Sequence, residues 1–323
     1  MTPRTQRLVA AFVAFAAALV LGGLSACGML LGVRPLADAE PGVTTYHALR
    51  VDGRERHFLL HLPPAAVRTR VPLVLAFHGY RGNGALLREV SRLDDAADAL
   101  GFAVAYLDGT GPLGWIGLSW NAGTCCGRAH AREVDDVGFA DSVVASLGRR
   151  LPVDTAHVFA VGFSAGGMLA LRLACARAKA YDAVADVAGA MPDLPCRPAR
   201  PVSVLLVQGA DDDELRFDLR TLRRPHGHPF AHSLEQALRF WAAHDGCTPG
   251  AVARDSSGTA LFERAIGCPS GREVALVTVA DHPHAWPGGV PTWPFGPRPA
   301  QQVDASRLAL EFFAGMAHAP GTP

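Results

Sequence analysis

Short apolar runs alternate along the chain with longer stretches in which apolar residues recur at helical spacing. The long stretches are typical of helices and cover 86–100, 134–151, 168–178, 233–244 and 303–317. The apolar runs have the length and content of β-strands, and they cover 44–51, 56–62, 71–77, 102–107, 158–163, 181–188, 202–207, 261–266 and 274–279. Asp52-Gly53 lies between the first two runs and predicts a hairpin.

This alternation predicts the α/β fold class, with a mostly parallel central sheet and helices on both faces. A long irregular stretch, 108–132, interrupts the alternation, and loops of this length are commonly functional. No linker rich in Pro, Gly or Ser divides the chain after residue 43, so we expect one domain over 44–318.

The N-terminal region has the pattern of an export signal. Arg4 and Arg7 precede an uncharged apolar stretch, 8–21, whose 14 residues are too few to span a membrane. Leu-Ser-Ala-Cys then ends at Cys27 and resembles the lipobox of bacterial lipoproteins. We expect a signal peptide over 1–27, a lipid group on Cys27 and a tether over 28–43. The alternative is an uncleaved membrane anchor, because the next charged residue is Arg34. Either way the protein is exported, as an envelope lipoprotein or a secreted enzyme.

The remaining cysteines agree with export, because an even number in an exported chain suggests disulfides. They are Cys125, Cys126, Cys175, Cys196, Cys247 and Cys268. Cys247 and Cys268 stand apart near the C-terminus, so we expect them to pair. Cys125 and Cys126 would then pair outward with Cys175 and Cys196, in an order that the sequence leaves open.

Composition narrows the function classes. Hydrophobic residues make up 49% of the chain and charged residues 19%, which suits a globular protein with a sizeable core. Lys and Arg number 30 and balance 30 Asp and Glu, so nucleic acid is not an expected partner. The cysteines lack Cys-x-x-Cys spacing, so a zinc site is not expected either.

The strongest chemical signal is Gly162-Phe163-Ser164-Ala165-Gly166, between a predicted strand and a predicted helix. This is the context of a nucleophile elbow, in which a sharp turn exposes a serine hydroxyl. Glycines on both sides give the turn room, and the following helix directs its free N–H groups toward the site. A tight turn around a small polar residue is the structural alternative. Ser164 is therefore the candidate nucleophile.

A serine nucleophile needs a base, and the base needs an acid that orients it. Two loops after predicted strands supply both types in the order expected after such an elbow. Asp211, Asp212 and Asp213 follow the strand at 202–207, and two histidines, His282 and His284, follow the strand at 274–279. Both loops lie at strand C-terminal ends, where an open α/β sheet places its site. The residues alone do not select one acid and one histidine.

The chain resembles the exported polyhydroxybutyrate depolymerase and feruloyl esterase family, which includes the LpqC-like lipoprotein esterases. The resemblance spans about residues 44–315, and its most specific stretches are Trp-Asn-Ala-Gly at 120–123 and His-x-Trp-Pro-Gly at 284–288. It is also carried by Phe-His-Gly at 77–79, Gly-Thr-Cys-Cys-Gly at 123–127, Val-Asp-Asp-Val at 134–137, and the stretches 162–168 and 209–217. This resemblance implies an α/β-hydrolase fold and a serine esterase.

The resemblance also selects among the candidate acids and bases. The family's Gly-Thr-x-Asp-x-x-Val-Pro-Tyr, laid on 209–217, places the acid at Asp212. Its His-Thr-Trp-Pro-Gly places the base at His284, with His282 as the alternative. The chain departs from the acid motif, so the rim of that loop is expected to differ, at Ala210, Arg216 and Phe217.

The resemblance implies a mechanism in which His284 takes the Ser164 proton as the hydroxyl attacks an ester carbonyl. Asp212 holds the imidazole in place. The backbone N–H groups of Ala165 and Tyr80 are the expected oxyanion donors. Water then releases the acid from an acyl-enzyme, and no cofactor or metal is expected.

The family's substrates are polyhydroxybutyrate or its oligomers, or feruloyl and acetyl esters of plant polysaccharide. The sequence shows no extra polymer-binding module, which favours 3-hydroxybutyrate oligomers or small esters. Trp120, Asn121 and Trp286 are candidate pocket residues. The alternative of another class is a non-catalytic surface lipoprotein that uses the fold as a binding scaffold.

Structural roles are expected for several other polar or aromatic residues. His78 should pack beneath the oxyanion loop with a backbone partner. Asp135 and Asp136 should begin a helix, where its dipole favours negative charge. The segment 293–295 should be a surface lid or packing segment. A metal site is not expected at the remaining scattered histidines, which are His226, His228 and His232.

Overall fold

The computed structural model describes residues 32–112, 114, 116–192, 194–214, 234–293 and 296–317. The predicted signal peptide with Cys27 lies outside these residues, as do Arg216, Phe217, His226, His228 and His232. Among the helices of the described chain, none combines the length and the apolar character that crossing a membrane requires.

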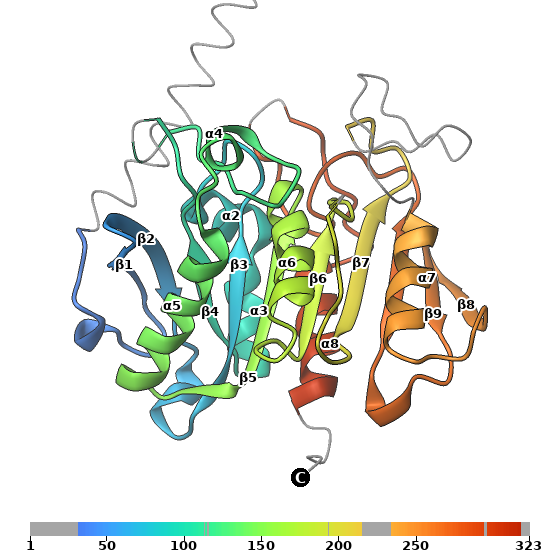
Figure 1. Ribbon diagram of the computed structural model, residues 1–323, viewed down its shortest axis with the longest axis horizontal. Helices are drawn as coiled ribbons and strands as arrows, with labels where there is room; N and C mark the ends of the chain where they lie inside the picture. Colours follow the sequence, from blue (N-terminus) through green and yellow to red (C-terminus); the bar gives the residue numbers. More distant parts are fainter. Residues whose placement is uncertain are drawn as a thin grey trace, which may run out of the picture.

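Within the described residues, ten strands form one sheet in the order β1-β2-β4-β3-β5-β6-β7-β10-β9-β8 (Figure 1). The central strands, from β4 to β10, run parallel, and antiparallel hairpins close both edges. This confirms the predicted mostly parallel sheet. The strands are β1 Thr44–Val51, β2 Arg54–His61, β3 Val71–Phe77, β4 Ala103–Leu107, β5 Val153–Phe163, β6 Ala183–Val187, β7 Ser203–Gly209, β8 Val252–Ser257, β9 Ala260–Ala265 and β10 Val274–Val279.

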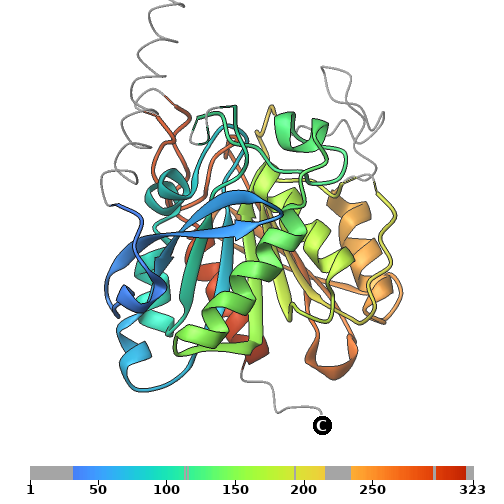
Figure 2. The same cartoon turned by 60° about the vertical axis from the view of Figure 1, so that its left-hand side comes forward.

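Helices cover both faces of the sheet (Figures 1 and 2). One face packs against α5, α6 and α7, and the other against α2, α3 and α8. The helices are α2 Gly84–Ser91, α3 Leu93–Leu100, α4 Gly127–Ala131, α5 Asp136–Arg150, α6 Ala165–Ala176, α7 Leu234–His244 and α8 Ala305–Ala317. Short 3₁₀ helices lie at η1 Leu36–Asp38, η2 Pro64–Val67 and η3 Pro269–Gly271.

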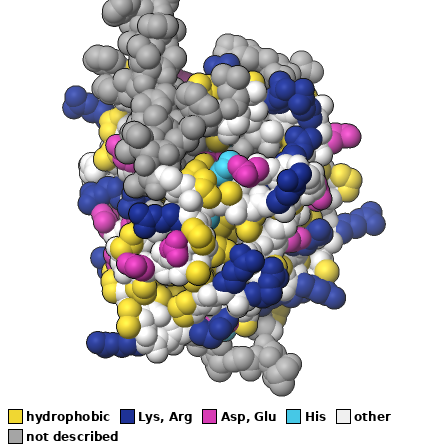
Figure 3. Space-filling view, turned by 90° about the vertical axis from the view of Figure 1, so that its left-hand side faces the viewer, with side chains coloured by type: hydrophobic (Ala, Val, Ile, Leu, Met, Phe, Trp, Pro, Cys, Tyr) yellow, Lys and Arg dark blue, Asp and Glu magenta, His cyan; other side chains and the backbone are white. Residues whose placement is uncertain are grey.

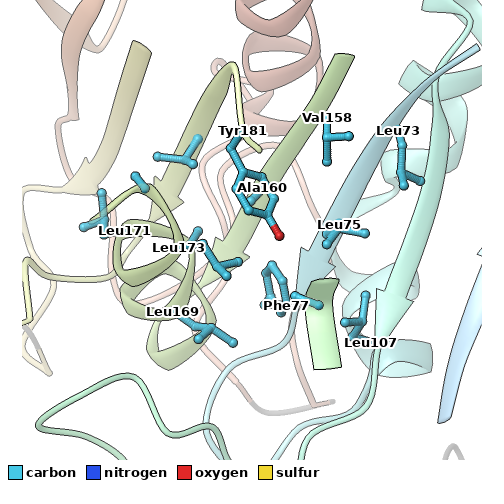
Figure 4. Packing of buried hydrophobic residues seen from close by; sticks show 14 of the residues in the cluster. Leu73, Leu75, Phe77, Leu107, Val158, Ala160, Leu169, Leu171, Leu173 and Tyr181 are labelled. Carbon is cyan, nitrogen blue, oxygen red and sulfur yellow. The ribbon is translucent and has the colours of Figure 1, made fainter. Parts of the chain in front are cut away.

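The core lies between the sheet and its two helical layers. Leu73, Leu75 and Phe77 of β3 lie on the face toward Leu169 and Leu173 of α6 (Figure 4). The intervening β3 residues face the opposite layer. Because both faces of the central strands are covered, those strands are apolar at nearly every position. The face of the molecule drawn in Figure 3 carries interspersed acidic and basic side chains, in keeping with a net formal charge of zero.

The structure differs from the sequence expectations in three local details. The single helix expected at 86–100 is two, because Arg92 takes a left-handed conformation with φ of 55° and ends α2. Neither α4 nor β8 was expected, since α4 is only five residues long and β8 is mostly exposed and polar. Part of the expected tether also packs on the domain, where Leu36 is buried and Val33 forms a bridge with Tyr46.

Disulfides among the described residues join Cys125 to Cys126, Cys175 to Cys196, and Cys247 to Cys268. The expected pair near the C-terminus is confirmed. The expected pairing of Cys125 and Cys126 with the other two cysteines is wrong, because these neighbours bond to each other. The fold brings Cys196 to Cys175 near the end of α6, with Cα atoms 4.9 Å apart. Disulfides are typical of proteins that fold outside the cytosol, so the chain has the covalent pattern of an exported protein.

Replacing both cysteines of a bridge by Ser should lower the free energy of unfolding by about 3 kcal/mol, for either of the two longer bridges. Both close loops with a sequence separation of 21, so the loss of loop-closure entropy is the same. Urea unfolding of the oxidised proteins measures the change. An unchanged unfolding midpoint in the Cys247→Ser/Cys268→Ser variant would contradict the expectation.

Candidate active site

Ser164 occupies the sharp turn between β5 and α6. β5 ends at Phe163 and α6 begins at Ala165, as the motif predicted. Ser164 has φ of 54° and ψ of −118°, a backbone conformation that non-glycine residues rarely adopt. Its N–H donates to the carbonyl oxygen of Val187 at 2.8 Å, which holds the turn against β6. The strained turn leaves the Ser164 side chain half-buried.

The two glycines of the motif are required by close backbone contacts. A Cβ on Gly162 would collide with the backbone of Gly166, and one on Gly166 would collide with the carbonyl group of Phe77. A side chain at either position would therefore push apart β3, β5 and α6. These contacts explain why the elbow needs glycine on both sides of Ser164.

Asp212 and His284 meet at the C-terminal ends of β7 and β10. The His284 Nδ1 donates to the Asp212 Oδ2 at 2.8 Å, because a carboxylate can only accept. The Asp212 side chain is 1% exposed, and it also accepts from Gln208 Nε2 at 2.7 Å and from the Glu214 N–H at 3.0 Å. The Nε2 of His284 is thus the nitrogen able to take a proton. It lies 3.7 Å from the Glu214 carboxylate, a neighbour that no sequence motif indicated.

The histidine loop packs directly against the elbow. The rings of His284 and Phe163, the residue before Ser164, have centroids 5.1 Å apart. The loop after β3 reaches the same ring, since a Cβ on Gly79 would lie 2.9 Å from the Phe163 side chain. The structure therefore gathers the nucleophile turn, the Asp212–His284 pair and the expected oxyanion loop around Phe163.

His282, the alternative base, has a structural environment. Its ring is fully buried, its Nδ1 accepts from the Ala300 N–H at 3.0 Å, and its Nε2 contacts the Ala285 carbonyl at 3.1 Å. Burial lowers the pKa of His282, which keeps the ring neutral. Both nitrogens are thus used within the loop that presents His284. By contrast with Asp212, Asp211 is exposed at the loop surface.

His78 supports the loop that carries the expected oxyanion donor Tyr80. It is buried, and burial lowers its pKa to about 4, so its ring is neutral at pH 7. The Gly109 N–H donates to its Nε2 at 3.0 Å, so its Nδ1 carries the proton and donates to the Gly79 carbonyl at 2.7 Å. Within the described chain, the N–H groups of Tyr80 and Ala165 donate to no backbone carbonyl.

The expected pocket residues are structural. Trp120 is fully buried and donates from Nε1 to the His78 carbonyl at 2.8 Å. Asn121 is 9% exposed and donates to the Val134 carbonyl at 3.1 Å. Trp286 is fully buried and donates to Ser306 Oγ at 3.0 Å. Their sequence positions near the site were informative, but their side chains point into the protein, where they donate to backbone carbonyls or, for Trp286, to a serine hydroxyl.

A buried ion pair that the sequence did not reveal braces the Trp-Asn-Ala-Gly loop. Arg56 Nη2 lies 2.7 Å from Asp136 Oδ1, and both side chains are buried. The other oxygen of Asp136 accepts from the Asn121 N–H at 2.7 Å. Asp135, one residue earlier, accepts from the Gly138 N–H and caps α5, as expected for an acid at a helix start. Only the fold shows that Asp136 forms a buried ion pair whereas Asp135 caps a helix.

A cavity of about 140 Å³ opens beside the elbow. Its walls are apolar side chains and the loop 78–82, and they include Leu86, Leu87, Val90, Phe163 and Trp293. Sequence reasoning missed this pocket because its walls come from α2, β5 and the segment 292–293, which are far apart in the chain. Among the described residues, no group of three or more His, Cys, Asp or Glu is placed to hold a metal ion.

Comparisons with known proteins match the chain to esterases. The family described as "Esterase PHB depolymerase" matches residues 56–193. NocK of Nocardia uniformis subsp. tsuyamanensis, a protein named as an esterase, is 33% identical over 307 residues, covering 87% of this chain and 85% of NocK. Feruloyl esterase B of Piromyces equi is 29% identical over 234 residues, covering 69% of this chain but only 41% of that enzyme.

Solved structures show the same fold at low sequence identity. S-formylglutathione hydrolase from Agrobacterium tumefaciens has a TM-score of 0.53 at 13% identity, covering 86% of this chain and 96% of that one. Acetyl xylan esterase from Aspergillus awamori has a TM-score of 0.53 at 14% identity, covering 75% and 94%. The fold and the relatives define an α/β-hydrolase that cleaves carboxylic esters. Within that class, the chain belongs to the polyhydroxybutyrate depolymerase and feruloyl esterase family.

Proposed function

We propose that this esterase works through Ser164, His284 and Asp212 and forms an acyl-enzyme. The observation that carries the proposal is the Asp212–His284 hydrogen bond of 2.8 Å beside a strained serine elbow. The bond leaves Nε2 of His284 as the base that takes the Ser164 proton during attack on the ester carbonyl. His284 then protonates the leaving alcohol, and a water molecule attacks the acyl-enzyme by the same proton route.

The oxyanion is held by backbone N–H groups of Ala165 and Tyr80 in this proposal. Ala165 begins α6, so its N–H lies at the positive end of the helix dipole. The neutral His78 fixes the loop on which Tyr80 lies. Donors held in place before the reaction stabilise developing negative charge without a reorganisation cost.

We propose 3-hydroxybutyrate oligomers or small esters as substrates. The cavity beside Phe163 supports this, because its small volume and apolar walls suit a short acyl or alcohol group. Feruloyl or acetyl esters of plant polysaccharide are the second candidate, supported by relatives named as feruloyl esterases. An ester panel tests the choice, with p-nitrophenyl acetate and butyrate, methyl ferulate and a 3-hydroxybutyrate trimer. Highest kcat/KM on methyl ferulate would favour the second candidate.

Filling the cavity should change substrate preference without removing activity. Val90→Phe adds bulk inside the cavity, so kcat/KM for p-nitrophenyl butyrate should fall about tenfold relative to that for the acetate. Glu89→Phe, with its side chain on the exposed side of the same helix, is the matched control and should keep the butyrate-to-acetate ratio. Equal ratios in all three proteins would show that substrates do not occupy this cavity.

We also propose that Cys27 carries a lipid and anchors the protein to the cell envelope. The support is the lipobox-like Leu-Ser-Ala-Cys after an apolar stretch, together with disulfides that require an oxidising compartment. Cys27→Ser should move the protein from the membrane fraction to the soluble or unprocessed fraction. If the variant stays in the membrane fraction at the wild-type size, the uncleaved anchor is the better explanation.

A further inference from the structure

Two buried polar side chains lie beneath the Asp212–His284 pair, on an otherwise apolar face of the sheet. Asp186 of β6 is 2% exposed and Gln208 of β7 is 4% exposed. Asp186 pairs in register with Leu206, two residues before Gln208. Side chains alternate along a strand, so both side chains point to the α6 face and are diagonal neighbours.

Gln208 connects this pair to the active site. Its Nε2 donates at 2.7 Å to Asp212 Oδ2, the oxygen that also accepts from His284 Nδ1 at 2.8 Å. The position of the Gln208 amide therefore affects the carboxylate oxygen that orients the proposed base. A rotated amide would present Oε1 to Asp212, and two acceptors repel each other.

The far side of the same amide needs a donor. Within the described chain, Gln208 Oε1 and Asp186 Oδ1 are both buried and have no hydrogen-bond partner. Two neighbouring acceptors in an apolar layer can both be satisfied by one shared proton. Burial raises the pKa of Asp186 well above its ordinary value. The Gly189 N–H lowers this pKa, and the charge of Asp212 raises it.

The surrounding backbone holds the Asp186 carboxyl group in place. A Cβ on Gly167, in the first turn of α6, would collide with Asp186 Oδ1, and so would one on Gly189. The carboxyl group thus fills a space that two glycines leave open, and it cannot swing toward solvent without moving α6. Because its own position is fixed, the Asp186 carboxyl group can set the orientation of the Gln208 amide.

We propose that Asp186 is a positioning residue, whose protonated carboxyl group donates to Gln208 Oε1 and thereby fixes the amide that holds Asp212 against His284. The proposal rests on the Ser164–His284–Asp212 mechanism. It assigns no contact between Asp186 and the substrate. Asp186 and Gln208 instead act through Asp212, and their effect is on turnover.

Kinetics of three single variants and one double variant test the coupling. Asp186→Leu removes the donor at similar size, so kcat should fall about tenfold with KM unchanged, as expected for one lost hydrogen bond in a charged network. Asp186→Asn restores a donor and should recover kcat to within about twofold of wild type. In Gln208→Met, kcat should fall at least as far as in Asp186→Leu. In the double variant Asp186→Leu/Gln208→Met, kcat should fall no further than in Gln208→Met alone.

The pH profile separates positioning from general damage to the fold. The acid limb of kcat/KM reports protonation of the catalytic base, and a carboxylate that loses a donor stabilises that protonated base more strongly, so the limb should move to higher pH in Asp186→Leu and Gln208→Met. It should stay in place in Asp186→Asn. Equal losses in Asp186→Leu and Asp186→Asn, or losses that add fully in the double variant, would overturn the proposal.

An infrared difference spectrum tests directly whether the Asp186 carboxyl group is protonated. This test depends neither on activity nor on the folding of Asp186→Leu. At pH 7 the wild type minus Asp186→Asn spectrum should contain the carbonyl band of a protonated carboxyl group. Absence of that band would overturn the proposal even if the proposed mechanism stands. If Ser164→Ala keeps wild-type turnover while the band is present, the proposed mechanism is wrong, but Asp186 is still shown to be protonated.

Discussion

Ser164→Ala should lower kcat at least a thousandfold on every ester that the wild type cleaves, with unchanged folding. The substitution removes only the hydroxyl group, and the Ser164 N–H, which holds the turn by donating to the Val187 carbonyl at 2.8 Å, is kept in the variant. The backbone turn at φ of 54° keeps its strain in the variant, and Ala accepts this conformation no better than Ser. Initial rates on the ester panel measure the loss.

Ser256→Ala is the matched control, because Ser256 is exposed on the edge strand β8 and should keep wild-type turnover. A fluorophosphonate probe should label the wild type and the control but not Ser164→Ala. Wild-type turnover in Ser164→Ala would show that another residue is the nucleophile. A folded, oxidised wild type with neither labelling nor turnover would revive the binding scaffold.

Asp212→Asn should have the next largest effect, a loss in kcat on the order of 10³- to 10⁴-fold. The amide can donate to His284 Nδ1, which stabilises the tautomer whose Nε2 carries a proton and cannot take one from Ser164. The side chain introduced by the substitution is also uncharged, so it attracts the Gln208 amide less strongly than the Asp212 carboxylate does. The loss should therefore appear in kcat far more than in KM.

Asp211→Asn tests the assignment of the acid at the neighbouring position. Asp211 is exposed and contacts the histidine loop through its backbone N–H, which donates to the His282 carbonyl at 3.1 Å. Its side-chain charge should matter little, so kcat should stay within about threefold of wild type. Losses of equal size in the two variants would make the assignment of Asp212 wrong.

The sequence was sufficient to predict the turn at Ser164 but not the pocket beside it. A nucleophile elbow is local, because strand, turn and helix follow one another within the stretch 158–178, so its pattern predicts its shape. The cavity walls come from three distant segments, and no local pattern connects Val90 with Phe163 or Trp293. Aromatic residues close to the site in sequence were the natural candidates, but the tertiary structure turns Trp120 and Trp286 inward.

The sequence by itself determined the alternation of strands and helices, the parallel sheet, the elbow at Ser164 and, through its motifs, which loops carry the proposed acid and base. These features depend on hydrophobic periodicity and on residues adjacent in the chain. Only the tertiary structure decided which cysteines meet, which tryptophans are buried, that Arg56 pairs with Asp136, and that Asp186 and Gln208 share one face of the sheet on neighbouring strands. Such contacts join segments far apart in sequence, and the packing of α6 and the loops onto the sheet sets their distances.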